Sequence, residues 1–297
     1  MTGAPRRLRR SKLFVPGVRG ELFAKALAGP ADAISFDLED AVPADAKDRA
    51  CQAVAAFLRA RGAAAADGKE MIVRVNALST GRMIEDLLAV AGPGLDTVNV
   101  PKVEGPREII VADEVLRHAE RAAGLAAGSI ALMPTLESPA GLRRAHEIAV
   151  ASPRVVALQL GTGDLKAATG MSVDTARLHA VRTLVVLAAA EAGVAALDSA
   201  FVNIADSAAF ERDAAESRAL GFAGKSCIHP SQVAACNRIF APTAAELDDA
   251  RALLAAYDAA RARGVGAINH RGMLVDQVHA LEARRLLQLA GDGGRAA

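Results

Sequence analysis

Charged side chains stand close to the ends of several short apolar segments of this 297-residue sequence. If these segments are successive parallel strands, their carboxyl ends lie at one edge and bring the charges together. A bare carboxylate there is costly to bury unless a cation pairs with it, and the carboxylates outnumber the cations. Oxygen ligands without a cysteine cluster are typical of Mg²⁺ or Mn²⁺ rather than zinc, so the set predicts a divalent-metal site. The carboxylates are Asp37, Glu39, Asp40, Glu137 and Asp164, and the cations are Arg74 and Lys102, with Lys25 and Lys47 as further candidates.

Each of these charges also has an ordinary explanation, as a salt-bridged or solvated residue at a strand end. The functional interpretation depends on their joint placement at successive strand ends. Lys225 and His229 belong to the last such segment. They are candidates for the same charged cluster, and the alternative is that they cap a turn. Cys227 shares a strand face with His229, but no third orienting group accompanies the pair. Cys227 is therefore interpreted as a small core residue.

The elements that would position these residues alternate along the chain. Short segments rich in Val, Ile, Leu and Phe are each followed by a longer, alanine-rich amphipathic stretch. Eight such units predict an α/β fold, a closed parallel (β/α)8 TIM barrel. The rival is an open doubly wound sheet, but the first turn has no GxGxxG. The predicted strands lie in 13–17, 33–40, 71–76, 97–102, 129–138, 155–164, 196–203 and 223–230, and the predicted helices are 20–28, 43–61, 80–91, 105–123, 139–150, 174–192, 206–219 and 231–239.

The last part of the chain is surplus to an eight-unit barrel. We expect residues 1–242 to form the barrel and 243–297 to form a helical lid or oligomerisation extension. This extension is predicted to contain a helix over 244–263, a flexible loop with the sequence GVGAINHRG, and a helix over about 276–290. The first helix carries an apolar stripe that needs a partner surface.

Composition excludes several classes of function. The formal net charge is +1, and the chain has no Trp and one Tyr, so neither a basic nucleic-acid surface nor a base-stacking platform is expected. Three scattered cysteines form no disulfide framework, which favours a reducing compartment. No apolar run is long enough for a signal peptide or a membrane helix. We therefore expect a soluble, cytoplasmic protein.

Several motifs run in one order across nearly the whole chain. On these motifs the chain resembles the citrate lyase β-subunit-like group of the HpcH/HpaI aldolase superfamily, alongside malyl-CoA and citramalyl-CoA lyases. The combination of SxLFVPG, DLEDAV and RVN is highly specific. The matching pieces are RSKLFVPG (10–17), ADAISFDLEDAVP (31–43), VRVN (73–76), VPK (100–102), LESPAG (136–141), LGTGDL (160–165), GKSCIHPSQ (224–232) and GMLVD (272–276).

The resemblance implies a Mg²⁺-dependent carbon–carbon lyase, with Mn²⁺ as an alternative ion. Its substrate class would be a 3-hydroxy-3-carboxyalkyl thioester, usually of CoA, that yields an oxoacid and an acyl thioester. Glu137 and Asp164 match the metal ligands, and Arg74 matches the substrate-binding and catalytic arginine. Asp37 and Glu39 match the acidic cluster next to the metal.

The resemblance assigns further residues and partners. Asp276 matches a catalytic aspartate that the C-terminal lid contributes to a neighbouring subunit, which implies a homo-oligomer, a trimer or hexamer with lid exchange. An acyl carrier protein within a citrate lyase complex is a further possible partner. The substrate-binding set is Arg74, Glu137, Phe14, Pro16, Gly17 and Lys102.

Three positions depart from the family pattern: Gly163 and Thr169 replace acidic residues near the metal, and Val278 replaces a proline in the lid. Two alternatives therefore stay open. One is a CoA-independent class II aldolase acting on hydroxy-oxoacids, although such enzymes typically use a histidine base and none lies near the early strand ends. The other is a non-catalytic relative, since a fold does not guarantee its function.

Overall fold

The computed structural model describes residues 8–62, 68–172 and 174–293. The chain divides into two compact units, and the boundary falls between Phe240 and Ala241. The first unit contains eight strands, and the second contains two long helices with a small hairpin. The two units are described separately below.

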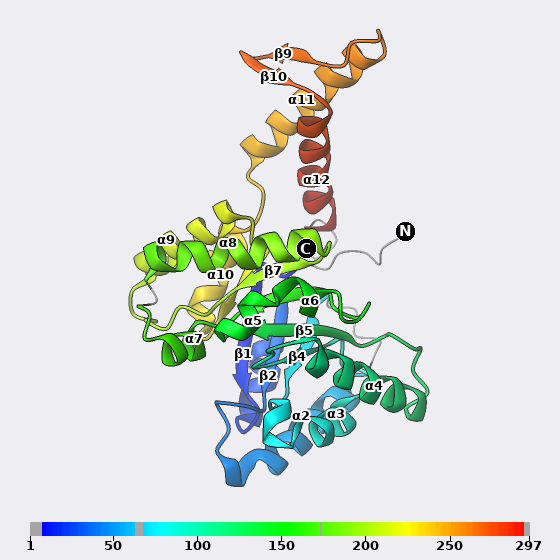
Figure 1. Ribbon diagram of the computed structural model, residues 1–297, viewed down its shortest axis with the longest axis vertical. Coiled ribbons are helices and arrows are strands. Elements are labelled where there is room, and N and C mark those ends of the chain that lie inside the picture. The colour runs from blue at the N-terminus through cyan, green and yellow to red at the C-terminus, as the bar shows by residue number, and fades with distance from the viewer. Residues whose placement is uncertain (1–7, 63–67, 173, 294–297) are drawn as a thin grey trace. The chain divides into compact units, whose positions relative to one another are not determined.

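The first unit is a closed barrel in which the strands follow one another in chain order from β1 to β8, and every neighbouring pair is parallel (Figure 1). Each expected segment overlaps one strand, so the predicted (β/α)8 barrel is confirmed. The strands are β1 (Ser11–Pro16), β2 (Ala33–Asp37), β3 (Glu70–Arg74), β4 (Thr97–Val100), β5 (Ala131–Leu136), β6 (Ala157–Leu160), β7 (Ala195–Asp198) and β8 (Gly224–Cys227).

Side chains alternate between the barrel interior and the surrounding helices. Part of the interior is filled by a small apolar cluster that includes Ala33, Ile72, Met133 and Leu197. The helix-facing side chains belong to a much larger core. The helices are α1 (Phe23–Ala28), α2 (Lys47–Arg61), α3 (Met83–Val90), α4 (Pro106–Ala122), α5 (Pro139–Arg143), α6 (Ala145–Ala149), α7 (Thr162–Thr169), α8 (Thr175–Glu191), α9 (Ser207–Leu220) and α10 (Pro230–Ile239), with short 3₁₀ turns at Gly20–Leu22, Ala44–Ala46 and Leu78–Thr80.

Helix α7 is an element that the sequence reading missed. The residues GTGD (161–164) fall within the predicted strand segment 155–164, but Thr162 already begins a helix and Gly161 is its N-cap. Asp164 consequently lies in the first helical turn, where the helix dipole favours a carboxylate. The helix ends at Gly170, whose φ of 69° suits glycine.

The second unit pairs α11 (Ala244–Arg261) with α12 (Gln277–Gly293). Thr243 and Glu246 form a reciprocal capping box at the start of α11. The predicted flexible loop is wrong in part, because Ile268–His270 (β9) and Met273–Val275 (β10) form an antiparallel hairpin. Its turn uses positive φ at Arg271 and Gly272, as a tight hairpin turn requires.

The apolar stripe of α11 finds a partner inside its own unit. Tyr257 on α11 packs with Val275 of the hairpin and Ala280 of α12, and all three are buried. Leu253, Leu254 and Ile268 pack around this cluster. None of the helices in the described part of the chain is long and apolar enough to cross a membrane.

Candidate active site

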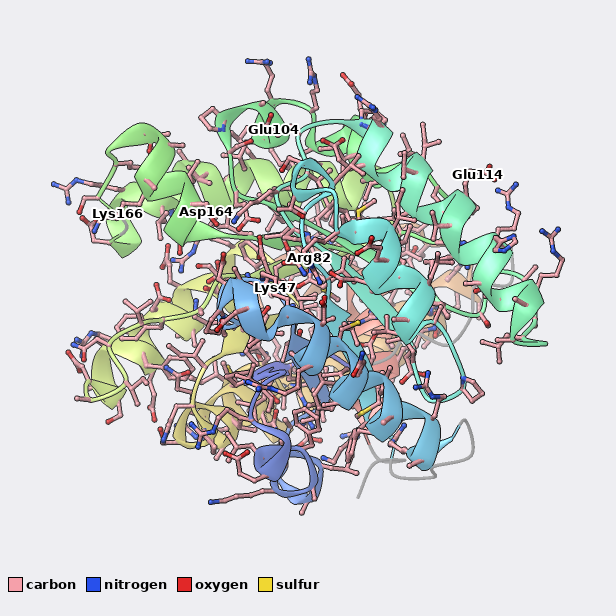
Figure 2. All side chains as sticks on the ribbon, turned by 90° about the horizontal axis from the view of Figure 1, so that it is seen from below. Lys47, Arg82, Glu104, Glu114, Asp164 and Lys166 are labelled. Carbon is pink, nitrogen blue, oxygen red and sulfur yellow. The ribbon has the colours of Figure 1, made fainter. Side chains whose placement is uncertain are left out.

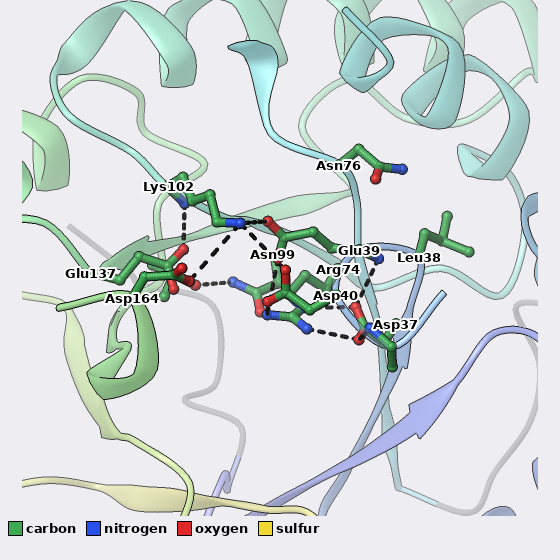
Figure 3. Close-up of polar contacts among 12 residues, drawn as sticks. Asp37, Leu38, Glu39, Asp40, Arg74, Asn76, Asn99, Lys102, Glu137 and Asp164 are labelled. Atoms are coloured by element: carbon green, nitrogen blue, oxygen red, sulfur yellow. Dashed lines mark hydrogen bonds and ion pairs between the residues drawn. The ribbon is translucent and has the colours of Figure 1, made fainter. Parts of the chain in front are cut away.

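The predicted charged residues of β2 to β6 meet at one end of the barrel (Figure 3). Asp37 and Arg74 are the last residues of β2 and β3, and Lys102, Glu137 and Asp164 follow β4, β5 and β6. Because these five strands are consecutive and parallel, their carboxyl ends lie side by side. The catalytic end of such barrels is this end.

Arg74 is held by Asp37 through a two-pronged ion pair. Its Nε and Nη2 donate to the two carboxylate oxygens of Asp37, each at 2.7 Å. Asp37 also accepts the backbone N–H groups of Glu39 and Ala41 at 2.9 and 3.1 Å. Burial disfavours the charge of Asp37, but Arg74 and these N–H groups outweigh it and lower its pKa. Asp37 is therefore an anchor for Arg74 and remains ionised.

The third nitrogen of the guanidinium faces the other acids of this loop. Arg74 Nη1 lies 3.0 Å from Glu39 Oε2 and 3.3 Å from Asp40 Oδ2. Glu39 is buried, and burial raises its pKa despite the nearby cations. Asp40 is half exposed. The face of Arg74 also lies 5.1 Å from the centre of the Phe14 ring on β1.

Lys102 joins the two halves of the acidic cluster. Its backbone N–H donates to Glu137 Oε1 at 2.6 Å, and its Nζ lies 2.9 Å from Glu39 Oε1. Asp40 and Asp164 are 3.3 and 3.9 Å from the same Nζ. Lys102 has a φ of 53°, a left-handed conformation that is costly for a side chain other than glycine. Strain of this kind concentrates at functional sites, and here it directs both donors into the cluster.

Glu137 and Asp164 are the two carboxylates on the side of the cluster away from Arg74 (Figure 3). Glu137 is buried, and desolvation together with the charges of Glu39 and Asp164 raises its pKa to about 8. Asp164 is 43% exposed, so its carboxylate remains open to solvent. At Gly161 a Cβ atom would lie 2.5 Å from Glu137 Oε2, so glycine is needed to leave room for this carboxylate.

This donor set fits Mg²⁺. Mg²⁺ is commonly held by one or two carboxylates and completes its octahedron with water and substrate oxygens. The described residues contain no group of three or more His, Cys, Asp or Glu side chains that could hold a metal by themselves. Glu137 and Asp164 would therefore supply two ligands and leave the other positions for water and substrate.

Hydrogen bonds to the backbone hold the end of β2 and the turn after it, which carry Asp37, Glu39 and Asp40. Lys47, the first residue of α2, donates to the carbonyl oxygens of Leu38 and Glu39, both at 2.9 Å. Directly after β1, the N–H of Gly17 donates to the Asp37 carbonyl at 2.8 Å. A Cβ at Gly17 would lie 2.8 Å from that oxygen. Figure 2 shows Lys47 and Asp164 on the helices that follow β2 and β6.

Of the predicted substrate-binding residues, Phe14 lies against Arg74. Pro16 is the last residue of β1, and Gly17 follows it. Asp276 lies in the second unit, between β10 and α12. Its carboxylate accepts the N–H of Val278 at 3.0 Å and lies 2.8 Å from His279 Nδ1. In its own unit Asp276 is thus an exposed helix cap.

Lys225 was a candidate for the charged cluster at the strand ends, but it lies outside that cluster. Its side chain faces the helices, where its Nζ lies 2.5 Å from Asp198 and 2.8 Å from Asp213. Arg182 on α8 bonds to the same two carboxylates. His229 caps α10 by accepting the N–H of Ser231. The alternative interpretation, capping, describes His229, whereas Lys225 belongs to a buried ion-pair cluster rather than to a cap.

The sequence reading also missed a polar layer inside the barrel. Lys12 on β1 is fully buried and bonds to Asn99 on β4 and Gln159 on β6. A signal existed in the sequence, since Lys12 lies two residues before Phe14 and therefore faces the same side of the strand.

The fold and site together define a class of protein. The profile of the HpcH/HpaI aldolase/citrate lyase family matches residues 10–230, and the chain belongs to this family. The predicted family is thereby confirmed, and so is the predicted class of enzyme, a carbon–carbon lyase.

Individual relatives cover almost the whole chain. The citrate lyase subunit beta of Escherichia coli K12 is 36% identical, over 96% of this chain and 94% of its own. The L-malyl-CoA/beta-methylmalyl-CoA lyase of Cereibacter sphaeroides is 35% identical over 96% of both chains. Among solved structures, CitE from Mycobacterium tuberculosis in complex with magnesium, acetoacetate and coenzyme A has a TM-score of 0.74 at 31% identity. That match covers 96% of this chain and 99% of the other.

Proposed function

We propose that the protein is a Mg²⁺-dependent lyase that cleaves, or forms by Claisen-type condensation, a 3-hydroxy-3-carboxyalkyl thioester. The products of cleavage are an oxoacid and an acyl thioester. The observation that carries this proposal is the convergence of Glu137, Asp164, Arg74 and Lys102 at the barrel mouth. The magnesium, acetoacetate and coenzyme A bound by the M. tuberculosis relative support the same substrate class.

Glu137 and Asp164 would hold the cation, which supplies Lewis acidity toward the carboxylate and hydroxyl oxygens of the substrate. Mn²⁺ suits the same ligands. The side chain of Lys102 carries a positive charge next to these ligands, where it suits the substrate carboxylate. Gly161 keeps the space in front of Glu137 open.

Arg74 would stabilise the enolate oxygen of the thioester product. Asp37 occupies Nε and Nη2, so Nη1 is the donor that turns toward substrate. A substrate oxygen would replace the half-exposed Asp40 at this position. Such an aimed, charge-assisted donor stabilises negative charge more in the transition state than in the ground state. The buried Glu39 holds this side of the guanidinium in place.

The remaining roles involve more than one chain. Asp276 would transfer the proton at the enolate carbon, from the lid of a neighbouring subunit in a trimer or hexamer. The thiol carrier is free CoA or an acyl carrier protein. The cytoplasmic location stays a prediction.

The test is metal binding measured by calorimetry with MgCl₂ and MnCl₂ on the full chain. Glu137→Gln and Asp164→Asn should each weaken binding strongly. Glu104→Gln is the matched control, because Glu104 is an exposed acid of the loop after β4 that forms no ion pair with the cluster in the described part of the chain. Unchanged Mg²⁺ affinity in both site variants would place the metal elsewhere.

The substrate test is a panel of malyl, citramalyl, citryl and methylmalyl thioesters, run beside free hydroxy-oxoacids with and without Mg²⁺. Cleavage of a thioester with release of an oxoacid supports the proposal. Turnover of the free acids alone would indicate the CoA-independent aldolase. No turnover of any member with Mg²⁺ bound would indicate a non-catalytic relative.

A further inference from the structure

The barrel interior holds a lysine that the active site described above does not use. Lys12 is fully buried, with its Nζ 2.7 Å from Asn99 Oδ1 and a second hydrogen bond to Gln159 Oε1. Its side chain crosses the interior, since β4 and β6 lie opposite β1 in the closed sheet. Within the described part of the chain no carboxylate is within ion-pair distance of this Nζ. A buried lysine without such a partner is rare.

The surroundings of Lys12 suit an ammonium group. The amide nitrogen of Asn99 donates to the carbonyl of Met133 and the hydroxyl of Thr135, both at 2.8 Å. These two bonds orient the amide so that its oxygen faces Lys12. The Phe14 ring completes the shell, with its centre 4.3 Å from Nζ. Two acceptor oxygens and an aromatic face together stabilise a cation.

Lys12 is also electrostatically connected to the mouth. The Phe14 ring that Lys12 contacts is the ring that faces Arg74. Burial, followed by the charge of Arg74, lowers the pKa of Lys12 well below its usual value, although the carboxylates of Asp37, Glu70 and Glu137 oppose this shift. The two acceptor oxygens and the ring face are thus the contacts that hold a charge on Lys12. The field of a charge on Lys12 therefore reaches both the arginine and one of the two metal-binding carboxylates. In an interior shielded from water, such a field is weakly screened.

We propose that Lys12 is a charged positioning residue, a fixed positive charge beneath the mouth with two opposite effects. It stabilises the negative charge that develops on the substrate, and it weakens the hold of Glu137 and Asp164 on a divalent cation. This inference rests on the proposed function. Loss of the charge would slow the reaction while tightening metal binding. A lysine that only filled space would, when removed, weaken both.

The experiment uses two variants of different kinds. Lys12→Met removes the charge, and Gln159→Glu neutralises it in nearly the same shape by placing a carboxylate against Nζ. Calorimetry with MgCl₂ alone should show roughly tenfold tighter binding in both, the order expected for one charge acting through protein on a divalent ion. The kcat on the thioester that the wild type cleaves should fall by roughly tenfold.

Lys69→Met is the matched control. Lys69 lies just before β3, at the opposite end of the barrel, and donates to the carbonyls of Gly29 and Ala31. It should leave Mg²⁺ affinity unchanged. Far-UV circular dichroism verifies the fold, and if Lys12→Met does not fold, Gln159→Glu decides alone.

Unchanged or weaker Mg²⁺ binding in the folded variants would overturn the role of Lys12 and leave the proposed function intact. A wild-type protein that binds no Mg²⁺ would overturn both. Tighter binding with an undiminished kcat would also refute the proposal, since it would show that the charge does not act on the reaction.

Discussion

The guanidinium of Arg74 can be tested by a substitution that keeps its charge. Arg74→Lys replaces a planar fork by a single ammonium group, which can retain one of the two 2.7 Å bonds to Asp37 but not both. The longer reach of Nη1 toward Glu39 and Asp40 is lost as well. The substitution therefore separates the need for charge from the need for an aimed donor.

The structure sets the expected magnitudes. A hydrogen bond between charged groups contributes about 1.5–3 kcal/mol, so the loss of one such bond should lower the free energy of unfolding by that amount. Loss of a donor aimed at a developing oxyanion typically lowers kcat by about 10²–10³. The fall in kcat should thus be much larger than the loss of folded protein could explain. Asp37→Asn should produce the same activity loss with Arg74 intact, because it releases the anchored edge of the guanidinium.

The assay is steady-state kinetics on the preferred thioester, combined with urea unfolding. Unfolding is followed by far-UV circular dichroism, since the chain has no Trp and one Tyr. Full activity in Arg74→Lys would refute the reasoning and show that only a charge, or nothing, is needed there. Activity lost in proportion to stability would mean that Arg74 only holds the loop together.

Three further predictions follow from particular contacts. Lys102→Gly and Lys102→Ala should both lose activity, but the glycine variant should be more stable by about 1 kcal/mol in urea unfolding, because alanine keeps the cost of the positive φ; equal stability would argue against backbone strain. Co-expressed Asp276→Ala and Glu137→Gln chains, each inactive alone, should recover part of the activity in verified mixed oligomers if Asp276 acts in the neighbouring subunit; no recovery would place it in its own chain or outside catalysis. Burial opposes the charge of Asp198 and of Asp213, but the two cations beside them lower both pKa values, so the stability these acids confer is present above about pH 4 and is lost as the pH falls through their folded pKa values. Urea midpoints measured from pH 6 to pH 2.5 should fall most steeply below about pH 4, and a flat profile would contradict the assignment.

The barrel could be predicted because each strand is a short apolar segment bounded by turn residues. Parallel strands in chain order place their carboxyl ends together. From this rule alone, the sequence predicted that Asp37, Arg74, Lys102 and Glu137 meet at one end of the barrel. The alternation of side chains along a strand could also have placed Lys225 on the helix-facing side of the barrel. Ser226 is the register neighbour of the interior-facing Lys12, so Lys225 next to it must face the helices.

Other features depend on contacts that a linear sequence does not contain. The strained φ of Lys102 is fixed by the bond of its N–H to Glu137, 35 residues away. The glycine at position 161 is required by its close approach to the Glu137 side chain, a contact between residues 24 positions apart, and helix α7 begins directly after it. The hairpin after α11 forms because Val275 completes a small core with Tyr257.

Two charge clusters in this chain show how structural and functional charges differ. Arg182 and Lys225 meet Asp198 and Asp213 between the barrel and its helices, and there two cations balance two buried carboxylates. The formal charges of such a cluster sum to zero, so burying a further ion in it would be unfavourable. At the mouth, five carboxylates meet two cations among the described residues, Arg74 and Lys102. Asp37, Glu39 and Glu137 are buried while Asp40 and Asp164 are partly exposed, so the surplus of negative charge faces the open side of the mouth, where a cation can compensate it. The imbalance, rather than the mere presence of acids, is what supports the proposal that the mouth binds a divalent cation.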